Sequence, residues 1–387
     1  ITVRIDNRVI IPIGVNSHSI TDHTQSNWNG ITGSINLTAT SKVFIDDIKV
    51  FPDLEKKIAK ILVSVKNPDN IDFKGKLTLQ AHSFNSSKDT KLPAKNVTIV
   101  TKAGEQQVVL NYKILNPQLW SEFKPALYKM SASLSEKNKI IDQCSVDFGM
   151  REFKTKGTRF EVNGRPVFLR GTTECCIFPL TGYPPSDTAS WDKVLQTCKD
   201  YGLNHVRFHS FCPPEAAFIA ADKLGIYFHI ECSSWANSGT AIGDGSPVDK
   251  FIYEEGDRII KAYGNHPSFC MLAYGNEPAG RNQNAFLGKL ITYWKAKDNR
   301  RVYTSGAGWP IIPENDYNLT SEPRIQHWGE GLKSIINSEP PQTMFDFRDY
   351  VSRYHIPTVG HEIGQWCAYP DFKEILQYKG VLKPSNF

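Results

Sequence analysis

The sequence lacks the features that mark membrane proteins, nucleic-acid binders and disulfide-stabilised domains. No apolar run approaches the ~18 residues that span a bilayer. The 45 lysines and arginines nearly balance the 40 acidic residues, and a net charge of +5 over 387 residues is unlike that of a nucleic-acid binder. The eight cysteines form no C-x-x-C pair and no metal-ligand spacing. We therefore expect no membrane or nucleic-acid partner, and buried free thiols instead of disulfides.

Several catalytic motifs are also missing. The sequence has no G-x-S-x-G turn of a serine hydrolase, no phosphate-binding loop and no G-x-G-x-x-G after a strand. His361-Glu362 begins like the zinc motif H-E-x-x-H, but Gln365 stands where the second histidine belongs, and the context is a strand. These absences argue against serine-hydrolase, nucleotide-dependent and zinc-peptidase chemistry, and we expect no cofactor.

Short runs of alternating apolar residues dominate the first 150 positions. The runs are Val43 to Val50 on either side of Asp46-Asp47, Ile61 to Val65, Leu77 to Leu79, Val108 to Ile114 and Tyr128 to Leu134. A period of two with turn residues between the runs predicts an antiparallel, immunoglobulin-like sandwich, to which we assign residues 42–153. Residues 1–41 offer two or three strands, too few for an independent domain. We interpret them as the tail of a β domain.

From about residue 155 short apolar strands alternate with helical patterns, which predicts a parallel sheet with right-handed crossovers. The expected strands are 167–170, 206–208, 226–230, 269–274, 302–305, 325–327 and 358–362. The expected helices are 191–198, with Ser190 as N-cap, 216–223, 251–263, 286–295 and 345–354. A (β/α)₈ barrel typically has ~250 residues. We therefore assign residues 154–387 to such a barrel, with its last unit missing.

In a (β/α)₈ barrel the active site lies at the C-terminal ends of the strands. The polar residues at predicted strand ends are Arg207, His209, Glu231, Asn276, Glu277, His327, Trp328 and Glu362. Two carboxylates flanking one bond are the usual equipment for glycoside hydrolysis. We favour Glu277 and Glu362 as this pair, with Asn276 near the sugar hydroxyls and Trp328 and Trp366 as apolar faces for the sugar. The alternatives for Glu231 are a third active-site acid or a structural ion pair with Arg207 or another basic residue.

Several segments resemble glycoside hydrolase family 2, the family of β-galactosidases, β-glucuronidases and β-mannosidases. They are Asn27-Trp28-Asn29-Gly30-Ile31, Leu119-Trp120-Ser121 with Pro125, Leu127 and Tyr128, Phe148-Gly149-Met150-Arg151 with Asn163-Gly164-Arg165-Pro166, and Asn276-Glu277-Pro278. They stand in the family's order. The resemblance implies that residues 1–41 are the C-terminal part of a sugar-binding jelly roll. It also implies a retaining β-glycosidase that takes an oligosaccharide or polysaccharide substrate.

The resemblance also implies a role for individual residues. Glu277 would be the general acid/base and Glu362 the nucleophile that forms a glycosyl ester. Asn276 would hold the 2-hydroxyl of the sugar, and Arg207 would keep Glu362 ionised. Glu277 needs a raised pKa, to which the charge of Glu362 would contribute.

Two segments depart from the family pattern and bear on which sugar is bound. Thr172-Thr173-Glu174-Cys175-Cys176 replaces a histidine-containing segment, and His209-Ser210-Phe211-Cys212-Pro213 replaces Ser-His-Tyr-Pro. No Asn-x-Lys can be assigned as the uronate-reading motif of β-glucuronidases. We expect a β-galactoside, with β-glucuronide and β-mannoside left open.

The other interpretation is a non-catalytic carbohydrate-binding fragment, since both ends of the chain are expected to be truncated. A homo-oligomer stays open. The family suggests a periplasmic or secreted bacterial enzyme, although the sequence itself carries no such signal.

Overall fold

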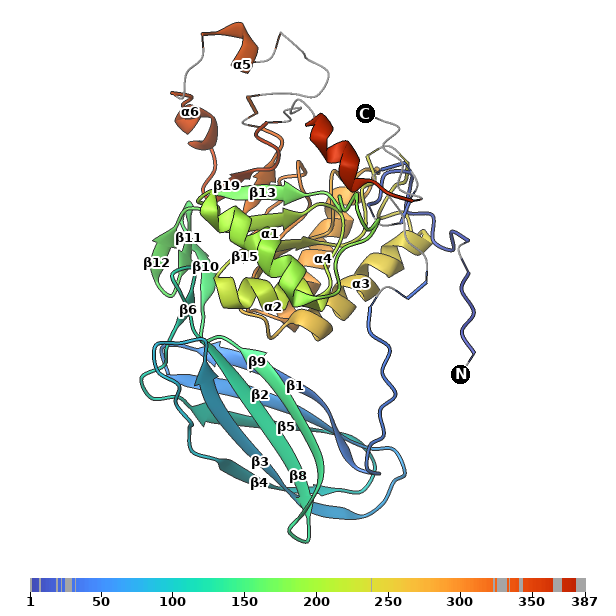
Figure 1. Cartoon of the computed structure of the whole chain (residues 1–387), viewed down its shortest axis with the longest axis vertical. Helices are drawn as coiled ribbons and strands as arrows, with labels where there is room; N and C mark the ends of the chain where they lie inside the picture. Colours follow the sequence, from blue (N-terminus) through green and yellow to red (C-terminus); the bar gives the residue numbers. More distant parts are fainter. Residues whose placement is uncertain are drawn as a thin grey trace.

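The structure, a computed structural model, has a β sandwich joined to an α/β body (Figure 1). It describes residues 2–6, 8–18, 20–21, 23–24, 30–31, 33–237, 239–322, 324–325, 333, 335–340, 344–364 and 371–380. Four tryptophan and histidine positions singled out above, Trp28, His327, Trp328 and Trp366, lie outside these residues. Within the described part of the chain, no helix has both the length and the apolar character needed to cross a bilayer.

Seven long strands form the sandwich. One sheet has the order β1 (Phe44–Asp53), β2 (Ile58–Asn67) and β5 (Gly104–Lys113). The other has the order β4 (Lys95–Thr101), β3 (Phe73–Phe84), β8 (Leu127–Glu136) and β9 (Lys139–Phe148). A two-stranded ribbon of β6 (Trp120–Ser121) and β7 (Lys124–Pro125) lies between β5 and β8 in the chain.

The predicted alternation is confirmed where one face of a strand is buried. Ile61, Val63 and Val65 of β2 point into the core, and Leu62 and Ser64 between them lie on the opposite face, where they are only partly buried. The Asp46-Asp47 interruption coincides with a register shift between Ile45 and Asp47 in the pairing of β1 with β2. Strands β4 and β9 were not predicted. In β4 the exposed Val100 follows the buried Ile99 and interrupts the apolar alternation, and in β9 only Phe148 is fully buried.

The two or three strands expected in residues 1–41 are absent from the described part of that segment. Instead, part of it lies against the α/β body, where Ile13 is buried in the core of that body. A strand needs a neighbour for its backbone groups, and the described residues supply none here.

Seven parallel strands are described in the α/β body. They are β13 (Gly171–Glu174), β14 (His205–Phe208), β15 (Tyr227–Glu231), β16 (Phe269–Ala273), β17 (Val302–Thr304), β18 (Asn318–Thr320) and β19 (Thr358–Gly360). The first five form one sheet in chain order, β18 pairs with β19, and a bridge between Gly308 and Thr320 links the two sets.

A helix follows each of the strands β13 to β16. These helices are α1 (Thr188–Asp200), α2 (Glu215–Leu224), α3 (Pro247–Tyr263) and α4 (Gln283–Lys297). Among the described residues no helix lies between β17 and β18, and the short α5 (Ile335–Ser338), α6 (Arg348–Val351) and 3₁₀ helix η2 (Phe372–Gln377) come later in the chain. The predicted alternation of strand and helix is therefore confirmed from β13 to β17.

Two local predictions were wrong, and one strand was not predicted. The first barrel strand is β13, because residues 165–167 form β12 (Arg165–Val167) of an antiparallel sheet with β10 (Phe153–Lys156) and β11 (Arg159–Val162). The unpredicted strand is β18, a short polar run, Asn-Leu-Thr, that pairs with β19. Of the expected strand 325–327, only Ile325 lies within the described residues. The N-cap of α1 is Asp187, whose carboxylate accepts from the Ser190 backbone N–H.

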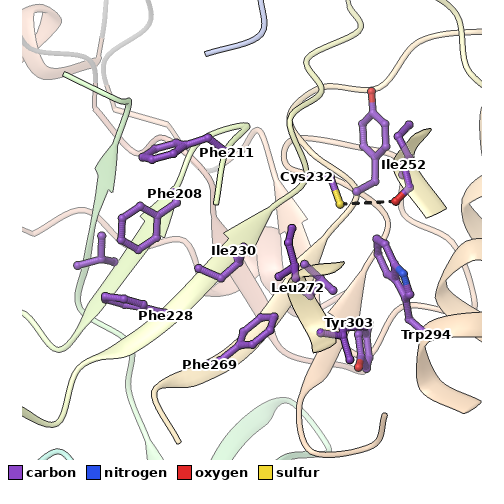
Figure 2. Close-up of a cluster of buried hydrophobic side chains, with 14 of the residues drawn as sticks. Phe208, Phe211, Phe228, Ile230, Cys232, Ile252, Phe269, Leu272, Trp294 and Tyr303 are labelled. Atoms are coloured by element: carbon purple, nitrogen blue, oxygen red, sulfur yellow. Dashed lines mark hydrogen bonds between the residues drawn. The ribbon is translucent and has the colours of Figure 1, made fainter. Parts of the chain in front are cut away.

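The core of the α/β body lies between the outer face of the sheet and helices α1 to α4. Figure 2 shows alternate residues of neighbouring strands, Phe208, Phe228 and Ile230, packed in one layer with Trp294 of α4 nearby. Because strand side chains alternate, the residues between them point to the inner face. Arg207 and Glu231 therefore lie on the inner face of the parallel sheet, opposite the helices.

Candidate active site

A cavity of about 1280 Å³ opens at the C-terminal ends of the parallel strands. Four of the residues predicted to be functional line it: Arg207, His209, Glu277 and Glu362. They come from the ends of β14, β16 and β19, far apart in sequence. The expectation that the strand ends meet in one site is therefore realised by the fold.

Arg207 is the buried centre of a polar network. Its Nε donates to Glu231 Oε1 at 2.6 Å, and its Nη2 donates to Asn276 Oδ1 at 2.7 Å. Glu231 also accepts from the Ser210 backbone N–H at 2.7 Å and is fully buried. Of the two interpretations of Glu231, the ion pair with Arg207 is the one observed. The carboxylate fixes the guanidinium that faces the site.

The segment after β16 explains the Tyr-Gly-Asn-Glu-Pro sequence. Gly275 has φ +154°, and a Cβ there would lie 2.2 Å from the Ser234 carbonyl oxygen, so no other residue fits. The next backbone N–H groups, of Asn276 and Glu277, donate to Ser234 and Ala307. Glu277 itself has φ +39°, a conformation that a non-glycine residue rarely adopts. This turn aims the Glu277 side chain into the cavity.

Two side chains hold the Glu277 carboxylate. Its Oε2 accepts from Trp235 Nε1 at 2.8 Å and from Asn237 Nδ2 at 2.6 Å. Burial raises the pKa of Glu277, the Trp235 hydrogen bond opposes this rise, and the negative charge of Glu362 adds to it. The direction is the one expected for a residue that carries a proton at the start of a reaction.

Glu362 lies among cationic and imidazole groups. Its Oε1 is 3.7 Å from Arg207 Nη1 and 3.7 Å from His209 Nε2, and its Oε2 is 3.7 Å from Arg324 Nη2. Burial and the charge of Arg207 lower the pKa of His209 well below its usual range, so this ring is neutral. The two guanidinium groups therefore supply the positive charge that stabilises an ionised Glu362.

His361 connects the two carboxylates. Its Nε2 lies 3.3 Å from Glu362 Oε1 and 3.7 Å from Glu277 Oε1. The separation between Glu362 Oε1 and Glu277 Oε1 therefore cannot exceed the sum of these two distances. The arrangement is therefore compatible with the ~5–5.5 Å separation of retaining glycosidases, although it also reaches the short end of the inverting range.

The segment before the sandwich forms one wall of the cavity. The ring centroid of His18 lies 4.6 Å from that of His209 and 5.6 Å from that of Trp235. Ser17 Oγ donates to the Ser233 carbonyl at 3.0 Å and fixes the segment on the loop after β15. Residues from the N-terminal part of the chain therefore reach a site built mainly by the barrel.

Sequence reasoning missed His18, Trp235, Asn237, Arg324 and His361. His361 adjoins a predicted residue, and Trp235 follows the strand end at Glu231, so both carried a positional signal. Arg324 and His18 follow no predicted strand and carried none. His327, Trp328 and Trp366 lie outside the described residues. No cluster of three or more metal-ligating side chains occurs in the described ranges.

Two family models match the chain. The model described as glycosyl hydrolases family 2 matches residues 43–151, and the TIM barrel domain of the same family matches residues 153–320. Together they cover most of the sandwich and the strands β13 to β18. The matched ranges include Arg207, Asn276 and Glu277.

Curated relatives carry two names. A putative beta-glucuronidase from Formosa agariphila is 26% identical over 343 residues, which cover 84% of this chain and 32% of that protein. A beta-galactosidase from Leuconostoc mesenteroides is 24% identical over 306 residues, covering 76% and 29%. The chain thus spans about a third of the length of these relatives.

Solved structures share the fold. A glycosyl hydrolase family 2 member from Bacteroides cellulosilyticus superposes with a TM-score of 0.60 at 22% identity, over 72% of this chain and 38% of that one. The beta-glucuronidase of Parabacteroides merdae gives 0.58 at 22% identity, over 68% and 34%. At this identity the likeness concerns the fold alone.

Proposed function

The chain belongs to glycosyl hydrolases family 2, and from that premise we propose that it acts as a retaining β-glycosidase on terminal β-linked hexosides. The observation that carries the proposal is that Glu277 and Glu362, from different strand ends, each lie within 3.7 Å of one imidazole nitrogen, His361 Nε2. Two carboxylates placed in this way in a cavity match the requirement of double displacement.

In the first step Glu362 attacks the anomeric carbon and forms a glycosyl ester, while Glu277 gives its proton to the departing oxygen. The raised pKa of Glu277 supports its role as the acid. Arg207 and Arg324, each with a nitrogen 3.7 Å from Glu362, support its role as the ionised nucleophile. Burial of the arginine network limits screening by water, so these charges act strongly.

In the second step Glu277, now a carboxylate, takes a proton from a water that attacks the anomeric carbon. The ester bond to Glu362 breaks and the sugar leaves with its original configuration. Asn276 Oδ1 accepts a hydrogen bond from Arg207. The Nδ2 atom of Asn276 is buried and has no hydrogen-bond partner among the described residues. We assign that N–H group to the 2-hydroxyl of the sugar, where it would contribute most in the transition state.

The sugar is proposed as a β-galactoside first and a β-glucuronide second. Relatives bearing both names support both choices. Arg207 and Arg324 line the cavity. Their guanidinium groups suit the carboxylate of a glucuronide as well as the Glu362 anion. A β-mannoside and a non-catalytic carbohydrate-binding role complete the alternatives.

The test is hydrolysis of para-nitrophenyl β-galactoside, β-glucuronide and β-mannoside by the chain and by Glu362→Gln. We expect one sugar to be released and the variant to lose at least roughly 10³-fold in kcat. Glu254→Gln, on the exposed face of α3, is the matched control and should keep full activity. Glu277→Gln should recover turnover with azide and yield a β-glycosyl azide.

Release of the opposite anomer as the first product would contradict the retaining mechanism. If the folded chain hydrolyses none of the three glycosides yet binds a β-linked polysaccharide, the non-catalytic interpretation replaces the enzyme.

A further inference from the structure

His361 is the least expected part of the site. Its side chain is completely covered, and it lies between the end of β19 and the Glu277 turn. Its Nε2 is buried and has no hydrogen-bond partner among the described residues, yet it lies within 3.7 Å of both Glu277 and Glu362. A buried polar atom without a partner is costly, so its position between two carboxylates requires a reason.

Arg324 determines which ring nitrogen carries the hydrogen. Arg324 Nη2 lies 3.1 Å from His361 Nδ1. A guanidinium group can only donate, so Nδ1 must be the acceptor, and the hydrogen of a neutral ring must then be on Nε2. The tautomer is assigned in this way from the hydrogen bond. The Nε2–H group therefore lies near both carboxylates, 3.3 Å from Glu362 Oε1 and 3.7 Å from Glu277 Oε1.

The surroundings keep the ring neutral. Burial, followed by the charges of Arg207 and Arg324, lowers the pKa of His361 to about 2. Glu277 and Glu362 face the same ring from the ends of β16 and β19 and act in the opposite direction. His209, also neutral, faces it from the end of β14.

Room for the ring is provided after β17. Gly308 has φ +92°, and a Cβ at this position would contact Glu277 Cγ at 3.4 Å and the His361 ring at 3.7 Å. The loop therefore permits His361 and Glu277 to approach each other without an intervening side chain.

We propose that His361 is a positioning residue whose Nε2–H group serves whichever of the two carboxylates is charged. The inference rests on the proposed double displacement. In the free enzyme Glu362 is the anion nearest to Nε2, and a small movement across their 3.3 Å separation would give it the hydrogen bond. In the glycosyl ester Glu362 has lost its charge, Glu277 has become the anion, and the same N–H turns to Glu277. No proton is transferred to or from His361, and Arg324 acts by holding the tautomer.

The tautomer can be tested without any substrate. The ¹⁵N imidazole shifts of the whole chain would be recorded and His361 assigned from the signals lost in His361→Gln. We expect an unprotonated Nδ1 and a protonated Nε2, unchanged down to about pH 5. A ring protonated at pH 7, or a hydrogen on Nδ1, would overturn the proposal while leaving the glycosidase assignment untouched.

Kinetics tests the role. On the aryl glycoside that the wild type hydrolyses, His361→Phe should lower kcat about 10- to 100-fold. His361→Gln keeps an N–H group and should restore most of this loss, a rescue that a merely structural role would not give. Thermal unfolding of each variant identifies losses of folding. A wild-type kcat in a folded His361→Phe would refute the role.

The variant Arg324→Met tests whether His361 acts through the ring tautomer that Arg324 holds. Removing Arg324 should lower kcat by itself, and adding His361→Phe should then lower kcat by a smaller factor than it does in the wild type, since the tautomer is no longer fixed. Equal factors in both backgrounds would show that His361 acts independently of Arg324. Failure of the wild type itself on every glycoside would count against the proposed function, and the NMR result would still decide the tautomer.

Discussion

At the scale of single residues, opposing contacts set the proton affinity of Glu277. Burial favours the neutral acid, and the Trp235 indole N–H, 2.8 Å from Oε2, favours the anion. Trp235→Phe removes that donor and keeps an aromatic ring. The pKa of Glu277 should therefore rise, and the basic limb of kcat/KM should move to higher pH by about 1 unit.

Trp309→Phe is the matched control for this prediction. The Trp309 indole donates to the Pro278 carbonyl at 2.7 Å and not to the carboxylate. Its removal should leave the basic limb in place. An equal shift in both variants, or no shift in Trp235→Phe, would mean that the indole does not tune Glu277.

The element that carries a site residue decides whether that residue could be predicted from the sequence. Arg207 and Glu231 stand between apolar residues on short strands, so the period of two places them on the inner face and their pairing was among the alternatives. Glu277 and Glu362 follow strands whose ends are visible in the sequence. Arg324 and His18 reach the site through loops, and no periodicity relates a loop residue to a cavity.

At the scale of elements, the ends of α1 and α2 offer a direct comparison. Gly202 and Gly225 follow these helices with the same φ of +77°. A Cβ at Gly202 meets nothing within 4 Å, whereas one at Gly225 lies 2.8 Å from the backbone of Glu122, next to the β6–β7 ribbon. The first glycine is required by backbone conformation alone, and the second also by close packing.

Gly202→Ala should cost about 1 kcal/mol of unfolding free energy, the usual price of a left-handed conformation. Gly225→Ala should cost at least about 2 kcal/mol more, because backbone must move. Urea unfolding of both variants measures the difference. Similar losses for the two would mean that the ribbon adapts without strain.

The elements that escaped prediction share a physical cause. β18 is three residues long with two polar side chains, and its pairing with β19 depends on partners about 40 positions away. The N-cap of α1 was misplaced because Asp187 and Ser190 are both good capping residues three positions apart. Local sequence defines the period of an element well and its ends poorly, since the ends depend on which backbone groups find partners.

At the scale of the whole molecule, the Phe-Gly-Met-Arg segment joins the two bodies. A Cβ at Gly149 would lie 2.7 Å from Pro267, so the chain can approach the α/β body only with glycine there. Arg151 then enters that body and donates to the carbonyls of Pro267, Arg300 and Phe269. The motif noted in the sequence is therefore a structural joint and not part of the cavity.

Arg300 extends the joint to the sandwich. Its Nη1 donates to the Val50 carbonyl of β1 at 3.0 Å, and its guanidinium lies 4.3 Å from the centre of the Phe51 ring. Because the Arg300 carbonyl is itself bonded by Arg151, the two arginines couple the sandwich to the barrel. We therefore expect the wild type to unfold in a single transition.

Arg151→Met should break this coupling. Three carbonyls lose the guanidinium donor, two of them at buried contacts, and the free energy of unfolding should fall by about 3 kcal/mol or more. Calorimetry should resolve two transitions, one for each body, where the wild type has one. Arg281→Met, at an exposed position, controls for loss of an arginine and should change stability by less than about 0.5 kcal/mol. A single transition in Arg151→Met, lowered as a whole, would show that the remaining contacts, including the Trp120 indole bond to the Asp222 carbonyl, suffice to unite the two bodies.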